Sequence, residues 1–330
     1  MARIPGTSYE HMTPSDVTSV PTSPEDAARL MRHATYASIT VALCLVLAKT
    51  IAWAMTDSLV LLATLIDSTL DVLASLINLF AVRHAITPAD REHRFGHGKA
   101  EALAGLAQSA FIAGSAGFLL LESGRRLLDP VPLDSYGAGL VVMIFSIAAT
   151  LGLLAFQRHV IRKTNSTAIK ADALHYRTDF LINISVIIAL LLAVEGWGGF
   201  DALFAIGIAV YILYSSWGIV RQSLDDLMDR ELPGEEREVI MQIAMAHAQV
   251  RGLHDLRSRR SGIATFIQLH LEVDDDLTLL QAHEISDEVE MQLQESYPAA
   301  EIIIHIDPAS VVPYEPVPAY LENQGASKQT

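Results

Sequence analysis

The sequence predicts a membrane all-α bundle of six helices, followed by a smaller C-terminal α+β domain with the element order αββαβ. Composition is the first reason: 51% of the 330 residues are hydrophobic and only 18% are charged, which is too apolar for an ordinary soluble enzyme. The second reason is that the apolar residues gather in six runs, most of which reach the roughly 17–25 residues that cross a bilayer. The third is a fall in hydropathy after residue 222, where periodicities typical of soluble helices and strands begin.

The six predicted spans are the apolar runs 34–55, 58–82, 102–121, 136–156, 180–194 and 200–220. The fifth run is long enough to cross a bilayer only if it begins near Ala173. That start brings His175, Arg177 and Asp179 into or beside the membrane.

Changes of composition divide the chain into four parts. Residues 34–222 are predicted to form the six-span domain, and residues 223–312 the αββαβ domain. Residues 1–33, which contain several Pro, Ser and Thr, are predicted to be a disordered tail. Residues 313–330 are predicted to be a second, loose tail.

Basic residues between the runs predict the orientation. Six spans place both ends of the chain on one side, and cytoplasmic loops carry an excess of Lys and Arg. We therefore expect a multi-pass protein with both termini in the cytoplasm and, for a Gram-negative source, in the inner membrane. The predicted cytoplasmic side carries Arg29, Arg32, Arg83, Arg91, Arg94, Lys99, Arg158, Arg162, Lys163 and Lys170, and the opposite side only Arg125 and Arg126.

The charge of the C-terminal part favours cations as partners. Residues 224–330 hold 21 Asp and Glu against seven Lys and Arg, and this excess is nearly all of the net charge of −15. Nucleic-acid binding needs clustered basic residues, so an acidic segment argues against it. The single cysteine, Cys44, excludes an intramolecular disulfide and a cysteine-based zinc site.

Soluble periodicities predict each element of the C-terminal domain. Residues 263–273 alternate apolar and polar side chains, the pattern of a half-buried strand. The order αββαβ follows from helix 235–249, strands 253–259 and 263–273, amphipathic helix 278–297 and strand 301–307.

Two pairs of polar residues in the second and fifth spans form the strongest chemical signal. Asp67 and Asp71 are four residues apart, as are His175 and Asp179, so each pair lies on one helical face. Carboxylates in a bilayer are costly and require a compensating cation. Facing each other, the pairs would suit a tetrahedral divalent ion, zinc first, with cadmium or ferrous iron as alternatives.

A buried ion-pair or hydrogen-bond network is the alternative interpretation of these four residues. Lys49 is the only candidate base within the membrane. It lies in the last third of the first span, where we expect it to extend to the outer headgroups.

Two further groups of histidines and acids are candidate metal sites. The loop between the second and third spans holds Asp90, His93 and His97. A pair of solvated histidines that binds no metal explains this composition equally well. The C-terminal domain holds His254, His270, His283 and His305, with Asp307 on the face of His305. Scattered surface histidines are the alternative there, and His247 is expected to be an ordinary core or interface histidine.

Four motifs in order resemble the cation diffusion facilitator family, specifically its bacterial zinc, cadmium and ferrous-iron efflux transporters, over about residues 34–312. They are Asp67-Ser68-Thr69-Leu70-Asp71, Phe95-Gly96-His97-Gly98-Lys99-Ala100-Glu101, His175-Tyr176-Arg177-Thr178-Asp179 and His254-Asp255-Leu256-Arg257. The resemblance implies a homodimer whose C-terminal domain is metallochaperone-like.

The resemblance also implies roles for individual residues. The family's transport site falls on Asp67, Asp71, His175 and Asp179, and its loop site on Asp90, His93 and His97. Its dinuclear cytoplasmic site falls on His254, His270, His283, His305 and Asp307, where zinc or a similar ion would be structural or regulatory. Lys99 and Asp229 match a charged pair that links the membrane helices near the dimer contact.

These features favour a secondary transporter that is not an enzyme, in which protons from outside displace the bound metal. A membrane-anchored metal sensor without transport is the alternative, but it leaves the costly membrane carboxylates unexplained. An intramembrane aspartyl protease needs its two Asp residues on different helices, whereas Asp67 and Asp71 share one.

Overall fold

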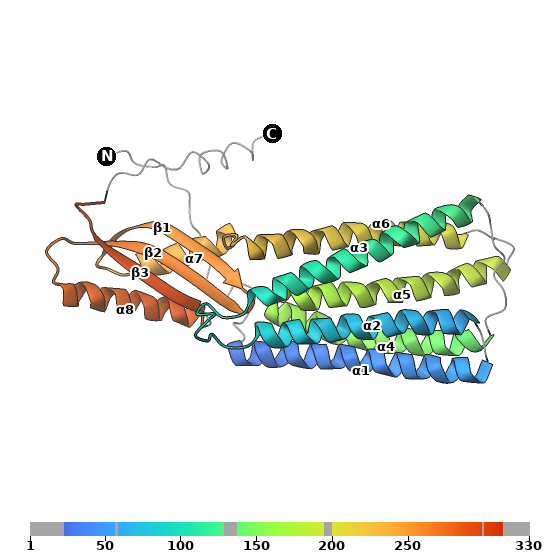
Figure 1. The fold of residues 1–330 in the computed structure, drawn as a ribbon. Helices are drawn as coiled ribbons and strands as arrows, with labels where there is room; N and C mark the ends of the chain where they lie inside the picture. Colours follow the sequence, from blue (N-terminus) through green and yellow to red (C-terminus); the bar gives the residue numbers. More distant parts are fainter. Residues whose placement is uncertain (1–22, 57–58, 129–136, 195–199, 299, 313–330) are drawn as a thin grey trace. The chain divides into compact units, whose positions relative to one another are not determined.

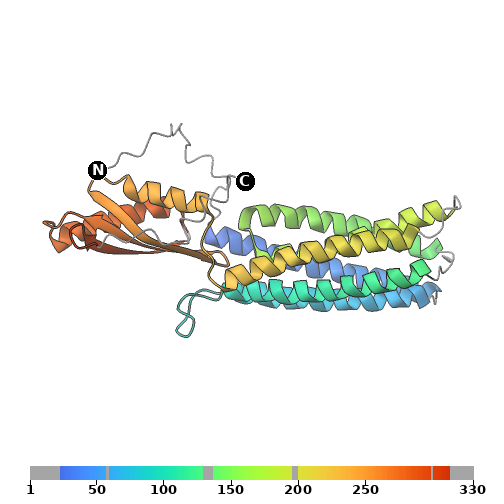
Figure 2. The same cartoon turned by 90° about the horizontal axis from the view of Figure 1, so that it is seen from above.

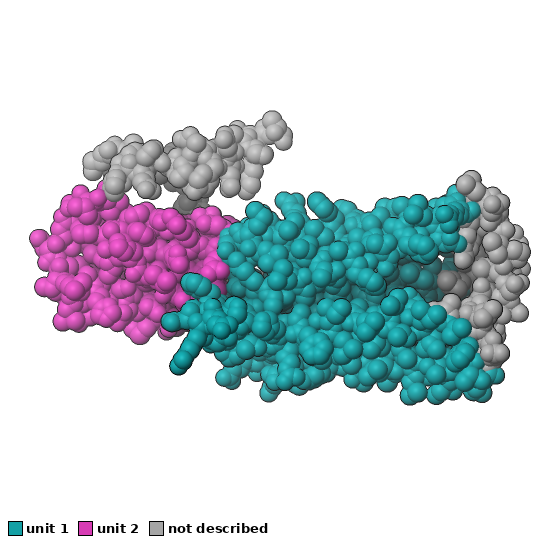
Figure 3. Space-filling view, in the orientation of Figure 1, with its two compact units in different colours: residues 1–230, 260–264 teal, residues 231–259, 265–330 magenta. Residues whose placement is uncertain are grey.

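The structure is a computed structural model that describes residues 23–128, apart from 57–58, together with 137–194, 200–298 and 300–312. It divides into two compact units, residues 1–230 with 260–264 and residues 231–259 with 265–330 (Figure 3). The first unit is helical and the second is a small α+β domain, so the predicted fold class is confirmed. Residues 1–22 of the first predicted tail and all of the second, 313–330, lie outside the described residues.

Six long helices lie side by side in the first unit (Figures 1 and 2). Five of those described are long and apolar enough to cross a membrane. The exception is α5, which is 28 residues long but carries Lys170, Asp172, Arg177 and Asp179 in its first half. The helices are α1 (Pro24–Thr56), α2 (Leu59–Ala85), α3 (Lys99–Leu128), α4 (Gly137–Thr164), α5 (Thr167–Val194) and α6 (Phe200–Leu227).

Helix α1 begins at Pro24, so the prediction of a disordered tail is wrong for residues 24–33. The Ser23 hydroxyl accepts a hydrogen bond from the backbone N–H of Asp26, 3.1 Å away, and so caps the helix. Proline at the first helical position and acids in the first turn favour the same start. Met31 is fully buried in this added segment, in a cluster with Val82 and Val160.

The centre of the helical unit is α5, which contacts all five other helices. Its N-terminus is held by Glu101 of α3, a buried residue whose carboxylate accepts a hydrogen bond from the backbone N–H of Ala168 at 3.4 Å. Asp172 and His175 in the first half of α5 are buried among these helices.

The second unit has the predicted element order αββαβ, with bounds that differ by a few residues. Its three-stranded sheet has the order β1-β2-β3. β2 and β3 are parallel, and two residues join β1 to β2, so these strands form an antiparallel hairpin. The elements are α7 (Gly234–Met245), β1 (Val250–Ser261), β2 (Ala264–Val273), α8 (Leu279–Ser296) and β3 (Ala300–Pro308).

One face of this sheet forms the core of the second unit. Ile267, Leu269 and Leu271 of β2 are buried with Ile240 of α7 and Val289 of α8, so both helices cover the same face. The alternating residues Gln268, His270 and Glu272 point to the other face, as the period of two predicts. That face is available for polar chemistry.

Candidate metal centres

The first cluster lies between α2 and α5. Nε2 of His175 is 3.0 Å from Oδ1 of Asp71 and 3.9 Å from Oδ2 of Asp179. One ligand atom from each of the three residues lies within 4.8 Å of the other two. Asp71 and His175 are buried, and Asp179 is half-buried. One imidazole and two carboxylates therefore converge inside the helical unit.

Asp67, the fourth residue predicted for this site, is exposed and lies outside the cluster. It is one helical turn before Asp71 on α2, so the two share a side of the helix, but Asp71 alone reaches His175.

Lys49 does not extend to the outer headgroups as expected. Its ammonium group donates to the Ser68 hydroxyl at 2.5 Å and to the Thr64 carbonyl at 3.2 Å, both on α2. These acceptors are available inside the bundle, so the charge is held against α2 beside Asp67.

A buried carboxylate that the sequence analysis missed lies one turn before the cluster on α5. Asp172 is fully buried and accepts hydrogen bonds from Ser38 of α1 (2.5 Å), Gln157 of α4 (2.7 Å) and Gln108 of α3 (3.3 Å). Three neighbouring helices are therefore fastened to α5 three residues before His175.

Tyr176 fastens two helices beside the same histidine. Its hydroxyl donates to the Ser38 carbonyl of α1 at 3.0 Å and lies 2.9 Å from the Ser75 hydroxyl of α2. Since the phenol has one proton, Ser75 donates in the second bond. Tyr176 is only 1% exposed, so its ring fixes the rotation of α5 at the site.

The second cluster is the loop between α2 and α3, where the three predicted residues come together. Asp90 lies 3.5 Å from Nδ1 of His93 and 3.4 Å from Nε2 of His97. The backbone N–H of His93, together with that of Glu92, holds the pKa of Asp90 below its ordinary value. Asp90 is therefore ionised at neutral pH and suited to a cation.

His97 is oriented for metal binding by its second ring nitrogen. Nδ1 lies 3.3 Å from the Thr87 carbonyl, to which it can only donate, and this leaves Nε2 as the acceptor that faces Asp90. His84 at the end of α2 packs edge-on against His97 with ring centroids 4.5 Å apart. His84 was not among the residues predicted for this site.

The third cluster lies on the open face of the sheet. His270 and His305 are paired in the register of β2 and β3, with ring centroids 4.6 Å apart. Asp307 lies 2.8 Å from Nδ1 of His270, 3.4 Å from Nε2 of His254 and 3.2 Å from Nε2 of His305. Removal from water raises the pKa of Asp307, but the hydrogen bond with His270 and the charges of the histidines outweigh this and lower it.

Two residues that were not predicted from the sequence, Glu272 and Gly252, orient His254. Nδ1 of His254 is 3.0 Å from Glu272, which leaves Nε2 to face Asp307. Gly252 makes room for that acid, because a Cβ there would collide with the Glu272 carboxylate. Asp255, next to His254, has a φ of 46°, a left-handed conformation uncommon for a non-glycine residue.

The remaining predicted residues have separate positions. His283 on α8 is exposed and lies 3.5 Å from Asp287, outside the cluster of His254, His270 and Asp307. His247 pairs with Glu288 at 2.9 Å. Lys99 and Asp229 do come together, with Nζ 3.0 Å from Oδ2.

The donor sets of the three clusters fit the same chemistry. Each offers imidazole nitrogen and carboxylate oxygen, and none of their residues is a cysteine. Zinc accepts such mixed sets at four-coordinate sites, and ferrous iron and cadmium accept related ones. Magnesium and calcium prefer sites made of oxygen alone.

Comparisons with known proteins agree with this chemistry. Residues 35–228 match the family described as "Cation efflux transmembrane domain", and residues 232–309 match "Cation efflux protein, cytoplasmic domain". The "Cation-efflux pump FieF" of Klebsiella pneumoniae is 50% identical over 285 residues, which are 86% of this chain and 95% of the relative. The protein of the same name from Citrobacter koseri is 48% identical over 287 residues, 87% of this chain and 96% of its own.

A solved structure also matches part of the chain. It is described as the metal-bound C-terminal domain of the CzcD transporter from Thermotoga maritima, and it is 25% identical. The match covers 24% of this chain and 99% of that chain, with a TM-score of 0.23 over this chain.

Proposed function

The chain belongs to the cation diffusion facilitator family, and on that premise we propose that it exports zinc, cadmium or ferrous iron from the cytoplasm in exchange for protons. Efflux of divalent metal cations by a multi-pass membrane protein, rather than catalysis, is the activity that this family indicates. The choice among metals, the exchange with protons and the homodimer are the parts that we propose.

The convergence of Asp71, His175 and Asp179 between α2 and α5 carries the proposal. A charged side chain at mid-bilayer costs about 2.5–3.5 kcal/mol on insertion scales. Among the described residues, His175 is the only base within ion-pair distance of Asp71 or Asp179. A transported divalent cation supplies the missing positive charge.

We propose Asp67 as the fourth ligand. It lies on the same side of α2 as Asp71, and a change of its side-chain rotamer toward α5 completes four-coordination. The mixed nitrogen and oxygen set favours zinc, cadmium or ferrous iron over manganese, which suits carboxylates and water.

His175 is the proposed proton carrier. An imidazole must be neutral to bind a metal, and it changes charge near physiological pH. Protons that enter from the outside of the membrane convert His175 to imidazolium and displace the ion. Protonation of Asp67, Asp71 or Asp179 adds to this effect, and the proton gradient drives the metal outward.

The cytoplasmic cluster is proposed as a regulatory site of a homodimer. Within one chain His254, His270, His305 and Asp307 gather, whereas His283 stands apart on α8. A site shared between two protomers accounts for that separation. Bound zinc, or a similar ion, would hold the two domains in a transport-competent arrangement when metal is abundant.

Two further parts of the first unit support the transport cycle in this proposal. Asp90, His93 and His97 form a loop site for the same ions. Lys99 and Asp229 tie the start of α3 to the end of α6 near the proposed dimer contact. With both termini in the cytoplasm, the loop site and the pair face the metal source.

The membrane-anchored sensor remains the alternative function. It would use the cytoplasmic cluster to report on metal and would not move an ion across the membrane. Metal flux therefore separates the two proposals directly.

Purified full-length chain in proteoliposomes is the test, with zinc, cadmium, ferrous iron and manganese compared under an imposed pH gradient. The Asp71→Ala variant should lose flux, because it removes a carboxylate from the centre of the cluster. Glu122→Ala is the matched control, since it removes a helix carboxylate from α3 that belongs to none of the clusters. Flux retained by Asp71→Ala, or metal binding without flux in the unmodified chain, contradicts the proposal.

A further inference from the structure

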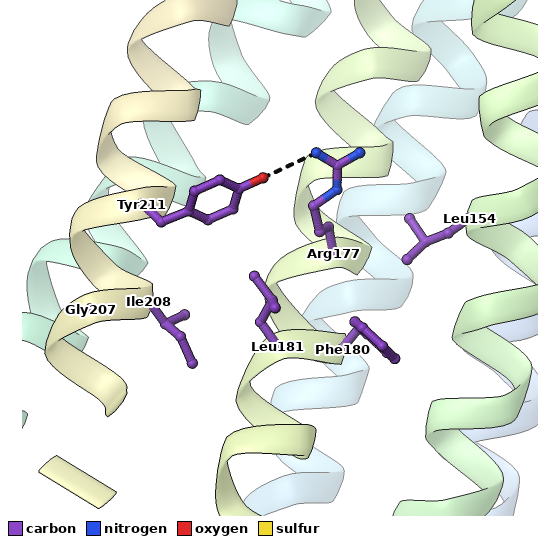
Figure 4. A pocket seen from close by; sticks show the side chains of 7 residues that line it. All are labelled: Leu154, Arg177, Phe180, Leu181, Gly207, Ile208 and Tyr211. Carbon is purple, nitrogen blue, oxygen red and sulfur yellow. Dashed lines mark hydrogen bonds between the residues drawn. The ribbon is translucent and has the colours of Figure 1, made fainter. Parts of the chain in front are cut away.

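A pocket between α4, α5 and α6 has no role in the proposed transport cycle. It has a volume of about 470 Å³, within the range of small-ligand sites. Apolar side chains form most of its wall, namely Leu154, Phe180, Leu181 and Ile208 (Figure 4). The two polar lining residues are Arg177 and Tyr211.

Arg177 places a positive charge from α5 at this pocket. Its guanidinium donates to the Tyr211 hydroxyl at 3.1 Å. Among the described residues no carboxylate lies within ion-pair distance of it, although the side chain is exposed. An arginine in this setting is costly unless an anion or water compensates it. The helices supply the Tyr211 hydroxyl as one acceptor, and the other N–H donors of the guanidinium can bind a ligand.

Arg177 also lies on a different face from the metal cluster. It is two residues from both His175 and Asp179, which is about 200° around an α-helix. Its substitution therefore leaves the ligand geometry of Asp71, His175 and Asp179 in place.

The polar and apolar parts of the pocket are separated along the helices. The guanidinium lies toward the N-terminal end of α5, and Phe180 and Leu181 lie toward its C-terminal end (Figure 4). Helical side chains point back toward the N-terminus, which explains this direction. The site therefore has a cationic head and an apolar trough, the arrangement that complements an anionic amphiphile.

Gly207 of α6 lines the trough and keeps it open. A Cβ placed on Gly207 would meet no atom within 4 Å. Because Gly207 lines the pocket, a leucine at this position is expected to extend into the trough.

We propose that this pocket binds an anionic phospholipid, with its phosphate at Arg177 and Tyr211 and an acyl chain along the apolar trough. Guanidinium and phosphate match in charge and geometry, and basic pockets between membrane helices bind acidic headgroups. The bilayer supplies the apolar part of the ligand at high local concentration. On the orientation proposed above, the lipid comes from the cytoplasmic leaflet.

Native mass spectrometry of the full-length chain tests this, with phosphatidylglycerol or phosphatidylcholine titrated into the detergent. The unmodified chain should retain phosphatidylglycerol about tenfold more tightly, because the choline ammonium of phosphatidylcholine offsets the attraction of its phosphate to Arg177. Arg177→Gln should abolish this preference. Gly207→Leu should weaken binding of both lipids, because it fills the trough.

Two matched variants control for charge and for size. Arg221→Gln removes an exposed charge from α6 outside the pocket, and Gly218→Leu adds the same bulk to α6 where a Cβ also meets no atom within 4 Å. Both should bind the two lipids as the unmodified chain does.

Three results would contradict the proposed phospholipid site. Equal binding of the two lipids by the unmodified chain removes the anion preference. Loss of that preference in Arg221→Gln to the same degree assigns it to general surface charge. Unchanged binding by Gly207→Leu shows that no acyl chain lies in the trough.

Discussion

The imidazole of His175 lies 3.0 Å from the carboxylate of Asp71, across the contact between α5 and α2. This relationship joins the two membrane pairs that the sequence places 104 residues apart. In the proposed exchange a metal ion and a proton would compete for this site, because both would bind to Nε2 of His175.

Asp71 and Asp67 should not be equivalent. Asp71 touches His175, whereas Asp67 is exposed and must turn inward to bind. We expect Asp71→Asn to weaken zinc binding by more than the roughly 10–100-fold typical of losing an outer hydrogen-bonding partner. Asp67→Asn should weaken it less. Isothermal titration of the full-length chain, with the cytoplasmic cluster and the loop site removed in every variant, measures both; equal losses would contradict the difference in position.

Asp172 should stabilise the helical unit because its carboxylate oxygens accept hydrogen bonds from three other helices. Asp172→Ala leaves the Gln157 and Ser38 donors without their acceptor, and a loss of about 1–3 kcal/mol is expected for each buried donor left unpaired. Asp172→Asn should cost less, because rotation of the Gln108 amide presents its unpaired Oε1 to the new amide. Thermal unfolding in detergent compares the two, and an equal loss in both would contradict this account of the network.

Gly252 should matter for metal binding far more than for folding. Gly252→Ala pushes a methyl group into the Glu272 carboxylate, which orients His254. Binding at the cytoplasmic cluster should weaken by roughly 10–100-fold, as for other changes behind a ligand. Gly234→Ala is the control in the same domain, because a Cβ there meets nothing within 4 Å. Zinc titration in a background that carries both Asp71→Ala and His93→Ala isolates this site; affinity equal to that of the control would contradict the orienting role.

The ion pair that closes the open end of the β1–β2 hairpin should depend on pH. Arg251 donates to both oxygens of Asp274, at 2.8 and 2.6 Å, and this bonding lowers the pKa of Asp274. A lowered folded-state pKa gives stability that is fully present above the ordinary carboxyl value of about 4. That stability is lost as pH falls through the lowered pKa.

Asp274→Asn should therefore reduce the resistance of the second unit to denaturant at pH 7. The difference from the unmodified chain should shrink below about pH 4, where the unfolded carboxyl is protonated. Denaturation followed from pH 2 to pH 8 checks this. A stability difference between the two proteins that grew as the pH fell would contradict the prediction.

The membrane site was predictable because its residue types are costly where the sequence places them. Asp71, His175 and Asp179 stand out in apolar runs, and their spacing defines helical faces. The same argument included Asp67, because spacing alone does not say which of two stacked carboxylates reaches the opposite helix. Asp172 was missed, since its three donors come from helices whose neighbours are set only by tertiary packing.

The start of α1 could have been read from Ser23-Pro24-Glu25-Asp26, a helix-capping pattern that was masked by the prolines around it. Glu272 and Gly252 could not have been paired in advance. Their contact depends on the register of β1 against β2, and a shift of one residue would place Gly252 away from the Glu272 side chain.

Simultaneous recording of zinc and protons in the same proteoliposomes tests the central claim most directly. Zinc added on the cytoplasmic side of the reconstituted chain, with a pH dye on both sides, should drive protons in the opposite direction. His175→Ala should lose both the zinc flux and the proton counterflow. Zinc flux that proceeds without proton counterflow, or with an unchanged pH dependence in His175→Ala, would contradict exchange at the His175 and Asp71 site.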